Sequence, residues 1–345
     1  MNKIIEDDIN SILNSTIPWK KFEGKSILIT GATGMIPSYV TLTLLTLNES
    51  LSKKCKIIVL VKNIKKAKKL FKNYLNEPSF KIVHQNVVNK LNIDSKINYI
   101  IHGASPADPT KYTDKPIDTL LPNIIGTKNL LEISNHKKFY GFLFLSSGAV
   151  YGNLKQKIIL ENNFGSLDPL DPRSCYAESK RMGENMCISW FHEKKVPIKI
   201  ARIFHTYGPT MNLDDGRIFA SLVSDVVKNK KLLINSNGKT ERPFCYIVDT
   251  VTAMFIILLK GKNGEAYNIS NPSQTVTINK LTKLIVKIFP EKKLEITRRK
   301  NRKKQIKNLT VTQYPDISKL KKLGWKPTFS IKHGFSRTIL SFLEK

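Results

Sequence analysis

The sequence predicts an α/β protein in which a doubly wound parallel sheet carries helices on both faces and a smaller C-terminal lobe lies beside it. Short apolar runs typical of β-strands alternate with helical stretches up to residue 269. One of these runs, residues 26–30, leads directly into Gly31 and Gly34, the pattern of a tight strand-to-helix turn. After Gly208 the alternation becomes irregular, which indicates the smaller lobe. With 345 residues, 41% of them hydrophobic and 9% aromatic, the composition excludes a disordered or fibrous chain.

The predicted elements can be justified in order along the chain. Residues 3–15 have the spacing of an amphipathic helix, and Trp19 and Phe22 can anchor the chain that follows it to the core. Residues 26–30, 36–47 and 56–61 form a strand, a helix and a second strand, which together make one β–α–β unit. Later strands are predicted at residues 81–83, 99–102, 141–146, 199–204 and 266–269, and helices at residues 123–134 and 176–193.

The charge is strongly positive, with 57 Lys and Arg against 27 Asp and Glu and a formal net charge of +30. Lysines are spread over the whole chain, and basic residues are dense only in residues 62–72 and 298–307. No zinc finger, RNA-binding aromatic signature or heptad-linked basic region accompanies them. We therefore interpret them as solvated surface charges and expect no nucleic-acid partner.

Other sequence features concern the compartment. The longest uncharged apolar run, residues 251–259, is too short to cross a bilayer, and the first ten residues have no apolar signal core. We therefore expect a cytoplasmic protein without membrane insertion. The four cysteines lie far apart in the sequence, so neither a disulfide framework nor a metal site is predicted.

Residues 30–37, TGATGMIP, have the pattern of a dinucleotide-binding turn. A glycine at the strand end permits the tight turn, and a second one lets the backbone approach a pyrophosphate at the helix N-terminus. Pro37 stands where a third glycine is usual. We predict a Rossmann-type site whose cofactor contacts are Gly31, Thr33, Gly34, Met35 and Ile36.

The residue after the second predicted strand bears on the choice of cofactor. An acidic residue there would pair with the ribose hydroxyls of NAD, whereas a basic residue can hold the 2′-phosphate of NADP. Lys62 stands at this position, so the sequence favours NADP(H) and leaves NAD(H) possible.

Tyr176 and Lys180 stand four residues apart in a predicted helix, so their side chains share one face. A nearby cation lowers the pKa of a tyrosine, which lets the phenol exchange a proton with a carbinol or carbonyl oxygen near neutral pH. Ser147 follows a predicted strand and offers a hydroxyl that can bind the same oxygen. These three residues are the predicted catalytic residues, although the spacing of Tyr176 and Lys180 alone is common on helix surfaces.

Together these segments resemble the extended short-chain dehydrogenase/reductase family, which includes nucleotide-sugar epimerases, dehydratases and reductases. The resemblance runs from about Phe22 to Leu343. It rests on Gly31-x-x-Gly34, His102-Gly-Ala-Ser105, Asn123-x-x-Gly126-Thr127, the Ser147 segment, Tyr176-x-x-x-Lys180, Arg202-x-x-x-x-Tyr207-Gly208-Pro209, residues 242–249, Tyr267-Asn-Ile and Leu323-Gly-Trp-x-Pro327. It implies a Rossmann domain of residues 1–204 and 244–271, with residues 1–22 as an N-terminal helical extension. Residues 205–243 and 272–345 would form the substrate-binding lobe.

The resemblance also implies roles for individual residues. Tyr176 would transfer the proton, Lys180 would orient the nicotinamide ribose, and Ser147 would hold the reacting oxygen. The implied partner is a nucleotide-diphosphate sugar, and the chain is expected to form a homodimer. Further cofactor contacts would be Asn86, Ala104 and Asn123, and further substrate contacts Ser105, His205, Arg217 and Arg242. For Asn86 a turn at the strand end, and for His205 a structural hydrogen bond, remain open as alternatives.

Departures from the family pattern narrow the expected reaction. Sugar 4,6-dehydratases carry an Asp–Glu pair directly after the position of Ser147, and decarboxylases of UDP-glucuronate carry a Glu at the position of Ala149. Here the two residues are Gly148 and Ala149, so both reactions lack their expected acid or base. We therefore expect an oxidoreductase that transfers hydride from NAD(P)H to a 4-keto, 6-deoxy nucleotide sugar in surface-polysaccharide precursor synthesis.

Other functions remain open at this point. Residues 204–209 and 214–217 resemble a branch that includes dTDP-4-keto-6-deoxyglucose reductase. A NAD-dependent C4 epimerase similar to UDP-glucose 4-epimerase would use the same catalytic residues. A non-catalytic dinucleotide-binding scaffold is disfavoured, because it has no need of Ser147, Tyr176 and Lys180 together.

Overall fold

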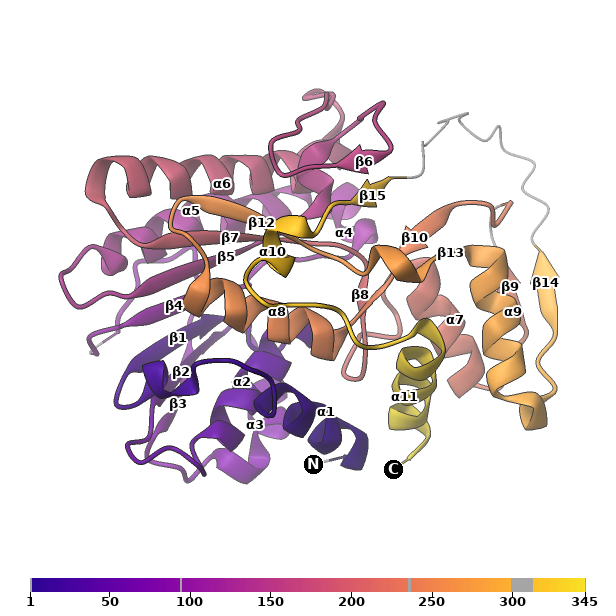
Figure 1. The fold of residues 1–345 in the computed structure, drawn as a ribbon, viewed down its shortest axis with the longest axis horizontal. Helices are drawn as coiled ribbons and strands as arrows, with labels where there is room; N and C mark the ends of the chain where they lie inside the picture. The colour runs from indigo at the N-terminus through magenta and orange to yellow at the C-terminus, as the bar shows by residue number, and fades with distance from the viewer. Residues whose placement is uncertain (1, 94, 235–236, 299–312, 345) are drawn as a thin grey trace.

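The centre of the molecule is a sheet of seven parallel strands (Figure 1). The computed structural model describes residues 2–93, 95–234, 237–298 and 313–344. Across the sheet the order is β12 (Glu265–Ile269), β7 (Ile198–Ile203), β5 (Gly141–Ser147), β4 (Tyr99–His102), β1 (Ser26–Thr30), β2 (Lys56–Val61) and β3 (Phe80–His84). The strand order reverses between β1 and β4, and ligands of such sheets bind at the carboxyl ends of the strands near this switch point.

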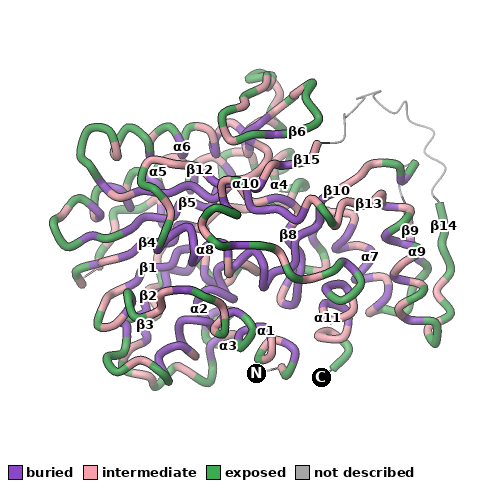
Figure 2. The backbone as a smooth tube through the Cα atoms, in the orientation of Figure 1, coloured by how far each residue is buried: buried purple, intermediate pink, exposed green. Residues whose placement is uncertain are grey.

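Helices cover both faces of the sheet because successive residues of a strand point to opposite sides. Ile27 and Ile29 of β1 lie in one hydrophobic core with α1 (Lys3–Leu13), α2 (Met35–Leu47) and α8 (Ile247–Lys260). Leu28 lies in a second core with α5 (Pro116–Ser134) and α6 (Cys175–Lys194). Figure 2 shows the resulting layers, with buried strands between helices that expose their outer sides.

The predicted doubly wound parallel sheet is confirmed, and the ends of every predicted strand differ from the observed ones by at most one residue. The helix predicted at residues 123–134 begins earlier, at Pro116, and contains Pro122. A proline inside a helix removes one backbone hydrogen bond. The residues around it, Thr119 and Asn123, are buried, so packing of α5 outweighs this loss.

The helix α8 contains the longest uncharged apolar run of the sequence. Its residues are almost all buried, because it packs against the sheet and against α1 and α2. Among the residues that the structure describes, no helix combines the length and apolar character needed to span a membrane.

The smaller lobe lies to the right of the sheet in Figure 1. It contains α7 (Ile218–Val227), α9 (Ile278–Ile288) and α11 (Ile331–Leu343), together with two short strand pairs. These are β9 (Leu232–Ile234) with β14 (Ile296–Arg298), and β10 (Glu241–Pro243) with β13 (Thr275–Thr277). β8 (Thr206–Tyr207) and β11 (Cys245–Tyr246) pair where the chain enters and leaves the lobe. The basic segment at residues 298–307 lies, apart from Arg298, outside the described residues.

Residues 314–328 lead from the lobe back to the sheet. β15 (Tyr314–Pro315) pairs with β6 (Ile158–Ile159), and α10 (Ser318–Lys321) packs against β12. Trp325 donates a hydrogen bond of 3.0 Å to the carbonyl of Asp249 in α8. This part of the predicted lobe therefore contacts the sheet domain, and the predicted division into two domains remains a prediction.

A buried carboxylate ties the N-terminal helix to the rest of the molecule. Asp8 of α1 accepts hydrogen bonds from Tyr39 of α2 at 3.0 Å and from Tyr246 of β11 at 2.7 Å. Arg337 of α11 donates to it at 2.8 Å. Removing one partner of a buried ion pair typically costs about 3–5 kcal/mol, because the other charge is left unpaired. The cluster thus links α1 to α2, β11 and α11.

Candidate active site

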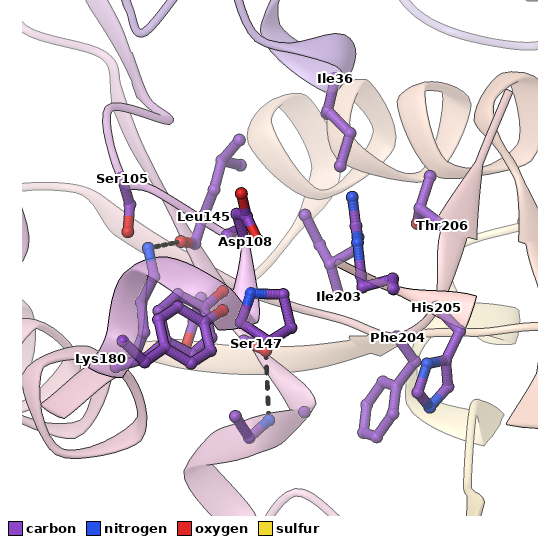
Figure 3. A pocket seen from close by; sticks show the side chains of 18 of the residues that line it. Ile36, Ser105, Asp108, Leu145, Ser147, Lys180, Ile203, Phe204, His205 and Thr206 are labelled. Atoms are coloured by element: carbon purple, nitrogen blue, oxygen red, sulfur yellow. Dashed lines mark hydrogen bonds between the residues drawn. The ribbon is translucent and has the colours of Figure 1, made fainter. Parts of the chain in front are cut away.

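A cavity of about 1100 Å³ lies at the carboxyl ends of β1, β4, β5 and β7, between the sheet and the small lobe. The sheet side contributes the glycine turn, Ser105, Ser147, Tyr176 and Lys180, and the lobe side contributes His205, Arg217 and Arg242. Figure 3 shows side chains from both sides facing this space. The structure therefore brings together residues that the sequence analysis placed in separate motifs.

The glycine turn forms the floor of the cavity. Gly31 has a positive φ of 70°, and a Cβ there would lie 2.7 Å from the Gly103 carbonyl oxygen, so only glycine fits. Gly34 caps α2 without a side chain, and Met35 and Ile36 line the cavity at the start of the helix. Uncapped N–H groups at a helix start suit a pyrophosphate, so the turn fits a dinucleotide cofactor. Thr33 lies in the same turn, half-buried.

The unusual Pro37 has a structural explanation. A Cβ added to Gly103, after β4, would lie 2.7 Å from Cγ of Pro37. In the usual motif the third glycine lets the helix lie close to the sheet. Here Gly103, directly after the neighbouring strand β4, leaves the space that the Pro37 ring occupies. This compensation explains how the turn accommodates a proline.

Lys62 and Asn86 are two of the predicted cofactor contacts that do not line the cavity, and they lie at the ends of neighbouring strands. Lys62 follows β2 with an exposed side chain, and its carbonyl contacts Nε2 of His84 at 3.1 Å. Asn86 follows β3, and its side-chain oxygen accepts a hydrogen bond of 3.3 Å from the backbone of Val88. This contact is that of a turn residue, which agrees with the alternative reading of Asn86.

Segment 103–105 is held by buried hydrogen bonds. Nε2 of His102 lies 3.2 Å from the Pro122 carbonyl, an acceptor, so Nδ1 accepts from the Thr30 hydroxyl at 2.8 Å. Burial, assisted by the charge of Lys180, lowers the pKa of His102 to about 3, so this imidazole is neutral. The Thr30 hydroxyl in turn accepts from the backbone N–H of Ala104 at 3.2 Å.

Asn123, predicted as a cofactor contact, is fully buried in α5. Its amide donates to the hydroxyls of Ser105 at 3.0 Å and Ser179 at 2.9 Å. Asn123 thus links the loop after β4 to α6, and Ser105 reaches the cavity.

Ser147, Tyr176 and Lys180 all line the cavity, where Figure 3 labels Ser147 and Lys180. Lys180 donates a hydrogen bond of 2.6 Å to the Leu145 carbonyl, and its Nζ lies 5.9 Å from the centre of the Tyr176 ring. Burial lowers the pKa of Lys180 to about 7. Burial also raises the pKa of Tyr176, while a hydrogen bond with the Ser147 hydroxyl opposes that shift. The Ser147 hydroxyl accepts from the backbone of Ala149 at 3.2 Å.

The sequence analysis missed Tyr112. This residue lies in α4 (Pro109–Asp114), and its ring stacks on Tyr176 with centroids 4.7 Å apart and planes at 9°. Asp108 caps α4 and also accepts from the backbone of Gly216 at 3.4 Å, so α4 connects the sheet domain to the lobe. No local pattern marks Tyr112, because its partner is 64 positions away in the chain.

A second missed feature is an ion pair next to the predicted catalytic residues. Glu184 accepts from Nε of Arg202 at 2.9 Å, from Nη2 at 2.7 Å, and from the Ser146 hydroxyl at 2.5 Å. The pair fixes the end of β5 that carries Ser147. Its sequence signal is that Glu184 stands four residues after Lys180 on the same helix.

The space beside Ser147 is closed by an aromatic ring. A Cβ added to Gly148 would lie 2.3 Å from the Phe204 ring, so this ring occupies the volume of any side chain at position 148. Phe204 stacks on Tyr151 with centroids 6.0 Å apart and is buried. Ala149 lines the cavity with a methyl group. Neither position supplies an acid or a base.

The lobe side of the cavity carries two guanidinium groups, Arg217 and Arg242. Nε of Arg217 donates to Asp215 at 2.8 Å, and the guanidinium lies 4.9 Å from the centre of the Phe219 ring. Arg242 donates to the Glu241 carbonyl at 3.2 Å, and within the described ranges it forms no ion pair. Burial lowers the pKa of Arg242, and a guanidinium remains charged at any physiological pH. This side of the cavity can bind an anion.

Fold and site together define an α/β protein with a dinucleotide turn and a Ser–Tyr–Lys group at one edge of its sheet. The chain matches the sequence model of the NAD dependent epimerase/dehydratase family over residues 27–270 and belongs to that family. UDP-glucuronic acid decarboxylase 6 of Arabidopsis thaliana is 31% identical over 315 residues, which cover 89% of this chain and 86% of the relative.

Solved structures show the same fold. UDP-glucuronic acid 4-epimerase from Bacillus cereus, in complex with UDP-glucuronic acid and NAD, aligns with a TM-score of 0.77 and 25% identity. The alignment covers 92% of this chain and 99% of that one. UDP-glucose 4-epimerase from Thermotoga maritima, with UDP-glucose, has the same TM-score and coverage at 24% identity. The expected membership in a family of nucleotide-sugar epimerases and dehydratases is confirmed, whereas the closer resemblance to a 4-keto reductase remains a prediction.

Proposed function

We propose that this protein is a nucleotide-sugar reductase that transfers hydride from a nicotinamide cofactor to a 4-keto, 6-deoxy sugar. The observation that carries the proposal is that Ser147, Tyr176 and Lys180 line the cavity together with Gly148 and Ala149, two residues without a carboxylate. The Phe204 ring fills the space beside Gly148, and Ala149 is apolar, so the site can move a hydride and a proton but has no group there for eliminating water.

In the proposed reaction Gly34 and the start of α2 would hold the nicotinamide cofactor, which would supply the hydride for the carbonyl carbon. The Tyr176 phenol donates its proton to the carbonyl oxygen, which becomes a hydroxyl, and the tyrosinate then regains a proton from solvent. The Ser147 hydroxyl donates a hydrogen bond to the same oxygen and orients it. Protonated Lys180, 5.9 Å from the Tyr176 ring centre, favours the tyrosinate electrostatically.

The lobe supports the choice of a nucleotide-diphosphate sugar as the substrate. Arg217 and Arg242 line the cavity opposite the glycine turn, and guanidinium groups bind phosphate oxygens through paired hydrogen bonds. With the diphosphate on the lobe and the cofactor on the sheet, the sugar would lie between them, next to Tyr176.

A C4 epimerase is the second candidate, favoured by the structural likeness to a 4-epimerase whose structure contains NAD. Purified protein should be incubated with a panel of nucleotide 4-keto-6-deoxy sugars and NADPH or NADH. A stable loss of absorbance at the reduced-nicotinamide band supports the reductase. Interconversion of nucleotide sugars without added cofactor would instead establish the epimerase.

The cofactor preference is tested at Lys62. The family is NAD-dependent, and NADP(H) remains our prediction from the basic side chain after β2. Lys62→Asp is expected to shift the ratio of kcat/KM for NADPH and NADH toward NADH, because the carboxylate repels a 2′-phosphate and pairs with ribose hydroxyls. Lys81→Asp, an exposed lysine of β3, serves as a control for net charge. An unchanged ratio in Lys62→Asp would show that Lys62 is a solvated surface lysine.

We propose that the chain forms a homodimer through α5 and α6. Ile117, Leu121 and Ile125 follow one side of α5 at intervals of four residues and are 65%, 39% and 38% exposed. On the adjoining α6, Met182 is 48% exposed. A two-fold axis brings the same apolar stripe of two copies together, which buries it in both.

Replacing both Leu121 and Ile125 with lysine is expected to convert a dimer to a monomer, as measured by light scattering after size exclusion. Leu170→Lys, at a site that is 90% exposed and lies outside α5 and α6, should leave the dimer intact. A double variant with the mass of the wild type would refute this interface.

A further inference from the structure

His205 projects from a strained turn into the cavity. It lies between β7 and β8 with a φ of 38°, a left-handed conformation that costs free energy for a residue other than glycine. The surrounding backbone holds it there, since the His205 carbonyl accepts from Cys245 at 3.3 Å and Phe204 donates to Ile269 at 3.0 Å. Non-glycine residues in this conformation persist where the structure imposes them, often at ligand sites.

The imidazole has no hydrogen-bond partner in the part of the chain that the structure describes. Its ring contacts Phe244, with centroids 6.2 Å apart, and lines the cavity (Figure 3). The structural hydrogen bond left open by the sequence is therefore not formed with any described residue. Both ring nitrogens are available to a ligand.

Two guanidinium groups and two carboxylates lie around this imidazole. The segment before α7 contributes Arg217 with its partner Asp215, and β10 contributes Arg242 and Glu241. Glu241 accepts a hydrogen bond of 2.9 Å from the Tyr314 hydroxyl. The helix α6 contributes Tyr176, which is neutral. Burial, together with the charges of Arg242 and Arg217, lowers the pKa of His205 to about 3. The free protein therefore holds this histidine neutral.

We propose that His205 gains a proton when the diphosphate of a nucleotide sugar binds between Arg217 and Arg242, and then donates a hydrogen bond to it. This inference rests on the proposed function, which assigns the cavity to such a substrate. The incoming anion offsets the two guanidinium charges that disfavour the imidazolium. His205 then adds a third positive group to the diphosphate site.

The sign of the pH dependence follows from linkage. The free-state pKa is about 3, and in the complex the pKa rises toward or above the ordinary value of about 6.5. Between these values the complex holds more protons than the free protein, so affinity rises as the pH falls. The slope approaches about tenfold in affinity per pH unit at pH values well below the pKa of the complex. Above that pKa, His205 contributes no pH dependence.

The experiment is calorimetric titration with dTDP-glucose and UDP-glucose, whose phosphodiester groups do not titrate near neutral pH. At about pH 6, binding is measured in buffers of different ionisation enthalpy, which gives the number of protons taken up. We expect uptake of about half a proton or more for the wild type and none for His205→Asn, since asparagine tolerates the left-handed backbone. His192→Asn, an exposed histidine at the end of α6, should keep the uptake.

The outcomes separate the two proposals. Binding by the wild type without proton uptake, or equal uptake by His205→Asn, would overturn the role of His205 and leave the proposed function standing. Failure of every nucleotide sugar to bind would overturn both. If His205→Asn does not fold, the proposal is tested by the affinity of the wild type as a function of pH. An affinity that does not change with pH below about pH 6.5 would refute protonation on binding.

Discussion

Tyr176→Phe is expected to lower turnover by about a hundred-fold to ten-thousand-fold, the usual contribution of general acid–base catalysis. The substitution removes one oxygen and leaves the ring, which stacks on Tyr112 at 4.7 Å and packs near Lys180. Because those contacts persist, the variant should fold and bind cofactor as the wild type does. The variant loses the proton that the reacting oxygen requires, together with the hydrogen bond to the Ser147 hydroxyl.

The measurement is kcat with the keto sugar found active in the panel, together with cofactor affinity and the thermal unfolding midpoint. Tyr140→Phe is the matched control, since that tyrosine is 40% exposed and its ring contacts Lys25 outside the cavity. Near-normal turnover in Tyr176→Phe would contradict the proposed mechanism. A loss of cofactor affinity of the same size would assign Tyr176 a binding role instead.

The second prediction is that the protein does not catalyse the elimination of water from nucleotide sugars. Elimination of water across C5–C6 of a 4-keto sugar needs a base for the C5 proton and an acid for the leaving hydroxyl. At the two positions after Ser147 the structure has a glycine packed against Phe204 and an alanine. We therefore expect dTDP-glucose, GDP-mannose and UDP-N-acetylglucosamine to remain unconverted to 4-keto-6-deoxy products.

UDP-glucuronate provides the sharpest version of this test, because relatives about 30% identical are decarboxylases of UDP-glucuronic acid. We expect no release of carbon dioxide by this protein. Mass spectrometry after long incubation measures both reactions, with Tyr176→Phe as the background. A product lighter by one water or one carbon dioxide, absent in Tyr176→Phe, would show that another side chain supplies the chemistry. The reductase proposal would then be wrong.

Much of the fold could be predicted because its signals are local. The strands of the sheet are short apolar runs, for example residues 56–61, that a buried parallel strand requires on both faces. Gly31 marks the turn because backbone geometry there excludes a side chain, and a Cβ at Gly34 would lie 3.2 Å from the Gly31 carbonyl oxygen. Tyr176 and Lys180 could be paired because a helix places residues four apart on one face. Each of these inferences needs only neighbours within one element.

Contacts between distant segments could not be predicted in this way. Tyr112 stacks on Tyr176, and Phe204 closes the space at Gly148, only because the carboxyl ends of parallel strands meet at one edge of the sheet. The partners of Asp8, which are Tyr39, Tyr246 and Arg337, come from three other elements. The spacing of residues in the sequence does not predict these contacts, because they depend on how the helices and strands pack.

The sequence by itself determined the class of fold, the glycine turn, the predicted catalytic trio and the lack of a carboxylate after Ser147, because each is a matter of residue identity at short spacing. Only the tertiary structure decided that Pro37 is accommodated by Gly103, that the Asn86 side chain accepts a hydrogen bond from Val88, and that His205 faces the cavity without a hydrogen bond from the described chain. Those facts depend on distances across the sheet and on burial. Burial and charge set the protonation of His102, Lys180 and His205, and they arise only once the chain has folded.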